Sequence, residues 1–219
     1  MTRLSNVTLA AFAFLAVSMA AHAGPTLTFD FTQTQVAQFS QPLGSVTLTQ
    51  NGANAVDVFV DLPTGFGFIN TGNKTPFTFN LAGALTVAIT TPVGGNFIAP
   101  NGSALVLSYS DAGGFPSTPY GSFSDAILKS GGNGSSRGYF GDLGFTVTRA
   151  GGLSTLDFVA NAGGYFFAAD VANSRGNTGT IATLGANPSV TPIPEPASLA
   201  LFGMALLGLA AARRVLGAG

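Results

Sequence analysis

The sequence has no cysteine and no tryptophan, and its only histidine is His22. A disulfide framework, a Cys-His catalytic pair and a cysteine-ligated zinc site are therefore excluded. His22 lies in an N-terminal segment that we expect to be removed, so the mature protein has no Ser-His-Asp triad and no histidine-ligated zinc site. Without disulfides, an exported domain needs a core large enough to hold itself together.

Charge is also scarce, since Asp, Glu, Lys and Arg make up 8% of the chain. In residues 24–189 eight aspartates outnumber the five cations, which are Lys74, Lys129, Arg137, Arg149 and Arg175. Such a body cannot neutralise a row of phosphates, so nucleic acid is excluded as a partner. The uncharged residues Thr, Ser, Asn, Gln and Gly must therefore provide most of the surface that contacts water.

The N-terminus has the pattern of a secretory signal peptide. Arg3 precedes an apolar run from Val7 to Ala21, and Ala21-His22-Ala23 is a small-residue cleavage site. We predict that residues 1–23 are the signal peptide and that signal peptidase cleaves before Gly24. The alternative is an N-terminal membrane anchor, which the short run and the cleavage pattern disfavour. The lack of cysteine excludes a lipid-modified N-terminal cysteine.

Residues 24–189 are expected to form one all-β domain. Apolar and polar residues alternate, as in half-buried strands, in the segments 27–32, 46–49, 56–61, 77–81, 85–89, 104–110, 121–128, 144–149, 155–161 and 165–171. Asn51-Gly52 separates two of these segments and predicts a hairpin. The pattern indicates a single antiparallel β-sandwich or jelly roll. A parallel β-solenoid is the alternative, disfavoured because the evenly spaced Gly-Gly pairs enclose dissimilar residues.

Carboxylates are the main remaining candidates for chemistry. Asp57 and Asp61 lie about 13 Å apart on one strand, whereas paired glycosidase carboxyls lie about 5–10 Å apart. A two-aspartate hydrolase would need residues from different strands, and this alternative stays open. Calcium would suit the Asp, Asn and carbonyl oxygens, but the aspartates are scattered and no EF-hand loop occurs. We therefore expect no enzyme, no metal and no cofactor.

Aromatic residues offer a second kind of site, because the chain has 19 phenylalanines and four tyrosines. Tyr139 lies near a predicted loop, and Phe166 lies in Gly164-Tyr165-Phe166-Phe167. An outward aromatic ring stacks well on a sugar, so Tyr139 and Phe166 are candidate ligand contacts for a carbohydrate-binding or adhesive module. The alternative for Phe166 is a strand that is buried on both faces.

The C-terminus is the most distinctive part of the sequence. Prolines at 192, 194 and 196 exclude a helix or a paired strand, so residues 190–196 are expected to form an extended linker. Residues 197–212 carry no charge and would span about 24 Å as a helix, slightly less than a typical transmembrane helix. Arg213-Arg214 then marks the start of a basic cytoplasmic tail, residues 213–219.

The order Pro194-Glu195-Pro196, apolar helix and Arg213-Arg214 resembles the PEP-CTERM sorting signal of Gram-negative bacteria. The resemblance implies that an exosortase, a membrane peptidase, recognises Pro194, Glu195 and Pro196, while Arg213 and Arg214 hold the tail at the inner membrane. It further implies transient anchoring, then release to the cell surface or an extracellular matrix associated with exopolysaccharide. The chain departs from the pattern by continuing to Gly219. An ordinary C-terminal membrane anchor is the alternative.

Several body segments, such as Thr64 to Phe68, also resemble ectodomains that precede this signal. That likeness is loose and implies no activity.

Overall fold

The computed structural model describes residues 23–72, 74–185 and 189–191 of the 219-residue chain. These residues form an all-β fold in which every strand pairing is antiparallel, so the predicted fold class is confirmed. None of the helices within these ranges is long and apolar enough to cross a bilayer. The predicted transmembrane helix, and the signal peptide apart from Ala23, lie outside the described residues.

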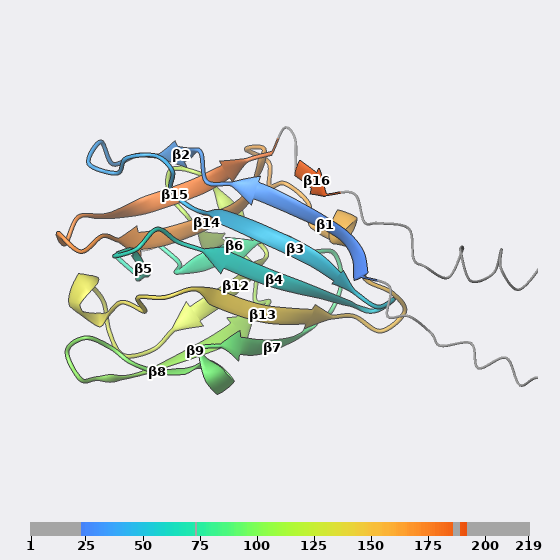
Figure 1. Ribbon diagram of the computed structural model, residues 1–219, viewed down its shortest axis with the longest axis horizontal. Helices are drawn as coiled ribbons and strands as arrows, with labels where there is room; N and C mark the ends of the chain where they lie inside the picture. Colours follow the sequence, from blue (N-terminus) through green and yellow to red (C-terminus); the bar gives the residue numbers. More distant parts are fainter. Residues whose placement is uncertain (1–22, 73, 186–188, 192–219) are drawn as a thin grey trace, which may run out of the picture. The chain divides into compact units, whose positions relative to one another are not determined.

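The strands form two large sheets and one small one (Figure 1). The first sheet has six strands, in the order β16 (Ser189–Thr191), β1 (Ala23–Asp30), β3 (Ser45–Asn51), β4 (Ala55–Asp61), β13 (Leu143–Thr148) and β7 (Thr86–Thr91). The second has eight, in the order β2 (Gln33–Thr34), β15 (Thr178–Leu184), β14 (Tyr165–Ala172), β6 (Phe77–Phe79), β12 (Asp125–Lys129), β9 (Ala104–Ser110) and β8 (Asn96–Ile98), with β5 (Gly67–Phe68) beside β14. A separate ribbon contains β10 (Phe115–Pro116) and β11 (Ser122–Phe123).

The predicted hairpin at Asn51-Gly52 is confirmed by the pairing of β3 with β4. Gly52 has φ +74°, a conformation that glycine adopts without the steric penalty of a Cβ atom. In the hairpin Val46 pairs with Val60 and Leu48 with Val58, and all four side chains are buried. The alternation of the sequence therefore places one face of this hairpin in the core.

Phenylalanines join the two sheets. The ring of Phe145, from the first sheet, lies 5.9 Å from that of Phe77 and 5.6 Å from that of Phe79, both from the second. Phe29 and Phe167 make a similar contact, with ring centroids 5.2 Å apart. Because buried residues of both sheets belong to one apolar cluster, the sheets form the two layers of a β-sandwich.

Two elements differ from the predicted strands. The segment expected as a strand at 155–161 begins instead with the short 3₁₀ helix η3 (Thr155–Asp157). The Ser154 side chain caps this helix, and the Asp157 carboxylate accepts a hydrogen bond from the Ser154 amide, 2.8 Å away. This reciprocal capping box outweighs the alternating pattern. Conversely, β15 was not predicted, although it pairs with β14 along most of its length.

The other two short helices lie between strands of the chain. They are η1 (Val93–Gly95) and η2 (Ser135–Arg137).

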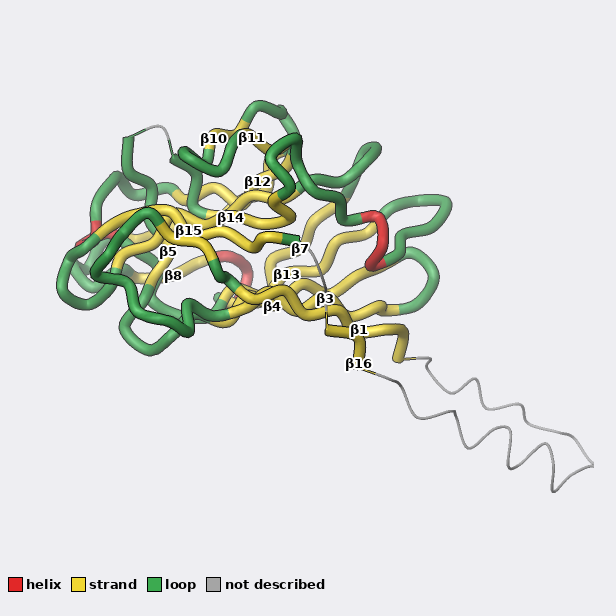
Figure 2. The backbone as a smooth tube through the Cα atoms, turned by 90° about the horizontal axis from the view of Figure 1, so that it is seen from above, coloured by secondary structure: helices red, strands yellow, loops and turns green. Residues whose placement is uncertain are grey.

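The first and last described strands are neighbours (Figures 1 and 2). Thr26 of β1 pairs with Thr191 of β16, and Thr28 pairs with Ser189. The antiparallel pairing puts the start of β1 and the end of β16 at one end of the sheet, which we call the tether end. The opposite end, where β1 stops at Asp30 and β4 at Asp61, is called the distal end.

We predict that Phe145→Ala lowers the free energy of unfolding by about 3–5 kcal/mol, because it leaves a cavity between the sheets. Phe59→Ala is the matched control, since Phe59 lies on neighbouring β4 with 44% of its surface exposed. The control should cost less than about 1 kcal/mol. Urea unfolding of the detergent-solubilised chain measures both, and equal losses would contradict this account of the core.

Candidate functional site

The distal end of the first sheet carries a row of oxygen-bearing side chains from adjacent strands. Asp30 pairs with Ser45, and Ser45 pairs with Asp61. Asp142 directly precedes Leu143, which pairs with Val60 on β4. The ladder thus brings together residues that are far apart in sequence.

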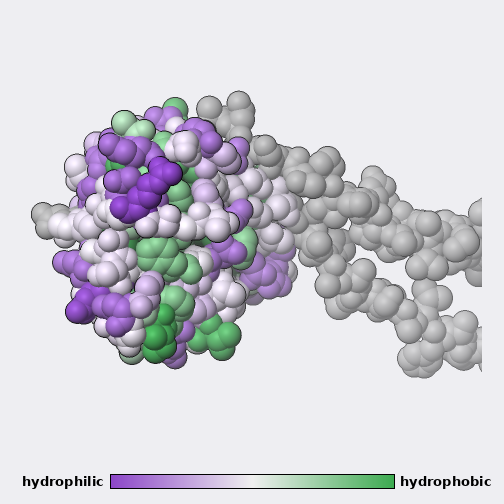
Figure 3. Space-filling model, turned by 60° about the vertical axis from the view of Figure 1, so that its left-hand side comes forward, coloured by the Kyte–Doolittle hydropathy of each residue, from purple (hydrophilic) through white to green (hydrophobic). Residues whose placement is uncertain are grey.

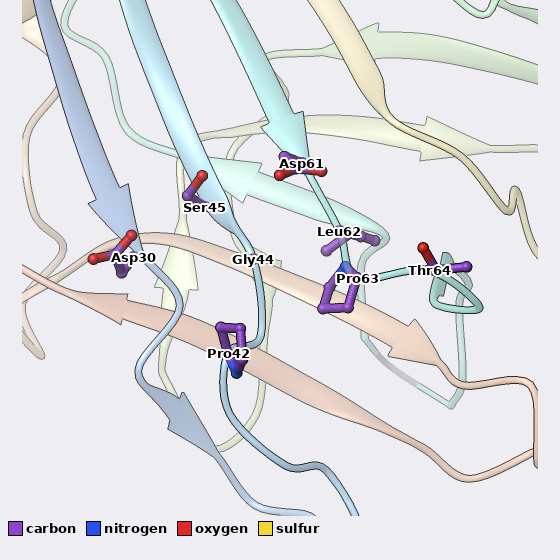
Figure 4. A pocket seen from close by; sticks show the side chains of 8 residues that line it. All are labelled: Asp30, Pro42, Gly44, Ser45, Asp61, Leu62, Pro63 and Thr64. Atoms are coloured by element: carbon purple, nitrogen blue, oxygen red, sulfur yellow. The ribbon is translucent and has the colours of Figure 1, made fainter.

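Two adjoining hollows open beside this row, and together we call them the distal cleft. The first, of about 400 Å³, is shown in Figure 4 and is lined by Asp30, Pro42, Gly44, Ser45, Asp61, Leu62, Pro63 and Thr64. The second, of about 350 Å³, shares residues 61–64 and adds Gly65, Phe66, Phe140, Gly141 and Asp142. Figure 3 brings this end toward the viewer and shows mainly hydrophilic surface with separate hydrophobic areas.

Gly44 lets the wall of the first hollow approach β4 closely. Its φ is +97°, and a Cβ atom there would lie 2.1 Å from the carbonyl oxygen of Asp61. Any side chain would therefore push the loop before β3 away from Asp61. The glycine fixes the width of the cleft.

Asp61 and Asp142 form a coupled pair of carboxyl groups. Burial raises the pKa of Asp61 above its usual value, and the charge of Asp142 and a hydrogen bond to it raise it further. A nearby negative charge disfavours the ionised form of a carboxyl group. The two carboxyl groups come from different segments, the end of β4 and the residue before β13.

Half-buried Phe66 and Phe140 line the same hollow as this pair. Carboxylate oxygens accept hydrogen bonds from hydroxyl groups, and phenyl rings offer an apolar face. The cleft is chemically suited to a ligand with many hydroxyl groups and an apolar side.

Asp57 has a different role. Its carboxylate accepts hydrogen bonds from Asn51 Nδ2, at 2.9 Å, and from Thr146 Oγ1, at 2.7 Å. These contacts tie neighbouring strands together on the outer face of the first sheet. In the described part of the chain, no three Asp, Glu, His or Cys side chains gather as metal ligands would.

The structure argues against the predicted ligand contact at Tyr139. The residue is 5% exposed, and its ring stacks on Phe68 with the centroids 6.1 Å apart. Its hydroxyl group donates to the carbonyl oxygen of Asp142, and burial raises its pKa to about 12. Tyr139 therefore supports the backbone beside the cleft and presents no open ring face to a sugar.

Phe166 is half-buried, and its surroundings explain why the alternation of Tyr165, Phe166 and Phe167 misleads. The register of β14 against β15 shifts between Tyr165 and Ala168. Both Phe166 and Phe167 consequently contact Phe29, at 5.0 and 5.2 Å between ring centroids. Tyr165 packs on the opposite side against Tyr120. The strand is covered on both faces, so a sugar-stacking role for Phe166 is not favoured.

Asp170 is a buried residue that the sequence did not single out. Its Oδ2 accepts hydrogen bonds from the backbone amide of Thr71, at 2.6 Å, and from Thr71 Oγ1, at 2.8 Å. These two hydrogen bonds hold in place the loop that continues from Phe66 of the distal cleft. Burial raises the pKa of Asp170 to about 6, although the Thr71 hydrogen bonds and the charge of Lys74 act in the opposite direction.

The burial of Asp170 predicts a specific pH dependence of stability. Between pH 4 and 6 the native state retains a proton on Asp170 that the unfolded chain releases. The contribution of Asp170 to stability therefore falls as pH rises through this window, by about 3 kcal/mol at most, and then stays level. Asp170→Asn should remove this component, whereas the exposed control Asp111→Asn should keep it. Chemical unfolding at several pH values measures the effect, and identical profiles for the two variants would contradict it.

The two ends of the described chain lead to the predicted processing sites. β1 begins at Ala23, so Ala23 and Gly24 of the signal-peptidase site open this strand, while Ala21 lies outside the described residues. β16 ends at Thr191, and its last two residues fall within the range expected for the linker. Pro194, Glu195, Pro196, Arg213 and Arg214 also lie outside the described residues.

A proline-rich segment, an apolar run and two arginines in this order have the composition of a C-terminal sorting signal. The chain carries the PEP-CTERM protein-sorting motif, because the model of that motif matches residues 192–214. The predicted resemblance is thereby confirmed for the C-terminal segment. No curated protein and no solved structure matches the chain.

This motif implies export, transient anchoring in a membrane and subsequent surface display. It also implies processing by an exosortase-type membrane protein.

Proposed function

We propose that this protein is a non-enzymatic surface or extracellular-matrix protein of a Gram-negative bacterium, released from the inner membrane by an exosortase and associated with exopolysaccharide. The observation that carries the proposal is the sorting motif at 192–214, which starts at the residue after β16. A membrane stop would halt export while the prolines hold the recognition site clear of the lipid. Signal peptidase and the exosortase would then free the domain at its two ends.

A Glu195→Ala substitution tests the sorting step. We expect wild-type protein outside the inner membrane and the variant retained in it, because the peptidase would no longer recognise the Pro-Glu-Pro segment. Asp111→Ala, an exposed acidic residue of the body, is the control and should behave like wild type. Immunoblots of membrane and extracellular fractions give the readout. The same distribution of all three proteins between the membrane and extracellular fractions would contradict the sorting mechanism and favour an ordinary membrane anchor.

The distal cleft favours a second function, carbohydrate binding. It combines the Asp61–Asp142 pair with Phe66 and Phe140. It also lies at the end of the sheet opposite the end of β16: β1, eight residues long, separates the two ends by about 23 Å. A displayed domain would therefore offer this cleft outward.

Retention of the protein on the host's own exopolysaccharide tests this function. We expect Asp142→Ala to weaken retention by at least about tenfold, because the substitution removes a charged hydrogen-bond acceptor for the sugar hydroxyl groups. Asp111→Ala should bind like wild type. Unchanged retention of Asp142→Ala would exclude the cleft, whereas release of new reducing ends by wild-type protein would indicate the two-aspartate hydrolase instead.

A further inference from the structure

Two large apolar side chains are exposed near the tether end of the domain. They are Leu156 and Val159, with 76% and 47% of their surfaces exposed, and we call them the tether-end patch. Leu156 and Val159 line a groove of about 270 Å³. Its other lining residues are Leu27, Phe29, Thr155, Phe158, Ala160 and Phe166.

The backbone at Gly185 rests on one wall of this groove, because a Cβ atom there would lie 1.9 Å from the ring of Phe166. The exposed Leu184 beside it does not belong to the patch. It pairs with Tyr165, which packs on the opposite side of the strand against Tyr120.

Hydrogen bonds fix the patch at the tether end. Gln50 Nε2 donates to the carbonyl oxygen of Leu153, at 2.6 Å, and the amide of Thr155 donates to Gln50 Oε1, at 3.1 Å. Gln50 adjoins Asn51, which pairs with Ala23 at the start of β1. The helix η3, which carries Leu156, is thus attached where β1 begins.

Charge near the patch is largely balanced. Asp157, the residue after Leu156, forms an ion pair with Arg149 at 2.6 Å. A balanced pair opposes contact with an apolar or anionic surface less than an unpaired aspartate would.

The chain beyond the described residues identifies what covers the patch. Only five residues, 192–196, separate β16 from the apolar run 197–212. Fully extended, they reach about 18 Å at most. Whenever the apolar run lies in a bilayer, the tether end is held close to the lipid surface.

We propose that the tether-end patch docks on the lipid bilayer while the protein is anchored, with Leu156 and Val159 entering the interfacial region. The inference rests on the membrane anchoring in the proposed function. Exposed leucine and valine side chains gain free energy on leaving water for this region. Docking at the tether end holds β16, and with it the start of the sorting motif, in a defined position above the membrane.

The absence of cysteine makes a direct test simple, because each introduced thiol is labelled without background. The full chain is prepared as Leu156→Cys, Val159→Cys and the control Ile98→Cys, each with an environment-sensitive fluorophore. Ile98 is 62% exposed on β8, which Figure 1 shows on the side of the domain away from β16. The proteins are reconstituted in phosphatidylethanolamine–phosphatidylglycerol vesicles that contain a nitroxide-labelled lipid.

We expect all three proteins to float with the vesicles, with blue-shifted, nitroxide-quenched fluorescence at positions 156 and 159 and neither effect at position 98. Adding Val159→Asp to the Leu156→Cys protein should reduce the quenching without abolishing flotation. Flotation with no quenching at 156 or 159 would overturn docking but leave anchoring intact. Concentration-dependent self-quenching at 156 without nitroxide quenching would assign the patch to a second copy and overturn docking too. Failure to float would overturn both anchoring and docking.

Discussion

The pairing of β1 with β16 is the constraint on which the arrangement of this molecule depends. Three residue pairs, from Thr26↔Thr191 to Thr28↔Ser189, bring the two ends of the domain together. The start of β1, at the predicted signal-peptidase site, and the end of β16, directly before the sorting motif begins, consequently lie at the same end of one sheet. The pairing brings together two segments that are far apart in the sequence.

Opposite ends of the domain differ in chemistry. The tether end exposes Leu156 and Val159 beside a groove, and Arg149 neutralises the nearby charge of Asp157. The distal end carries Asp30, Asp61 and Asp142, and the proximity of the last two raises the pKa of Asp61. Between the ends, the phenylalanines that join the sheets form a core in which no disulfide is needed. This polarity supports a protein that is held at one end and presents the other.

The parts that could be predicted from the sequence depend on local signals. The alternation in 46–49 and 56–61, with Asn51-Gly52 between them, predicts the β3–β4 hairpin because register and turn chemistry agree. The PEP-CTERM motif was recognisable for the same reason, since its parts follow one another in a short segment. The strand predicted at 155–161 failed because the capping box of Ser154 and Asp157 favours a helical turn.

The candidate sites depend on contacts between distant segments, and this limited their prediction. Nothing near Asp61 in the sequence indicates that Asp142, which directly precedes β13, will lie beside it and raise its pKa. Tyr139 seemed available because it follows a glycine-rich loop, but long-range packing on Phe68 buries it. The shift of register after Tyr165 turns Phe166 toward the core, and an alternating pattern cannot reveal such a shift. Asp170 is bound by Thr71, in a loop 99 residues earlier in the chain.

The intact mass of the protein recovered outside the inner membrane tests the central claim most directly, because both ends of the domain must be freed there. The account predicts a chain that begins at Gly24, retains Thr191 and lacks the apolar run 197–212. Extracellular protein that still contains residues 197–212 would contradict it.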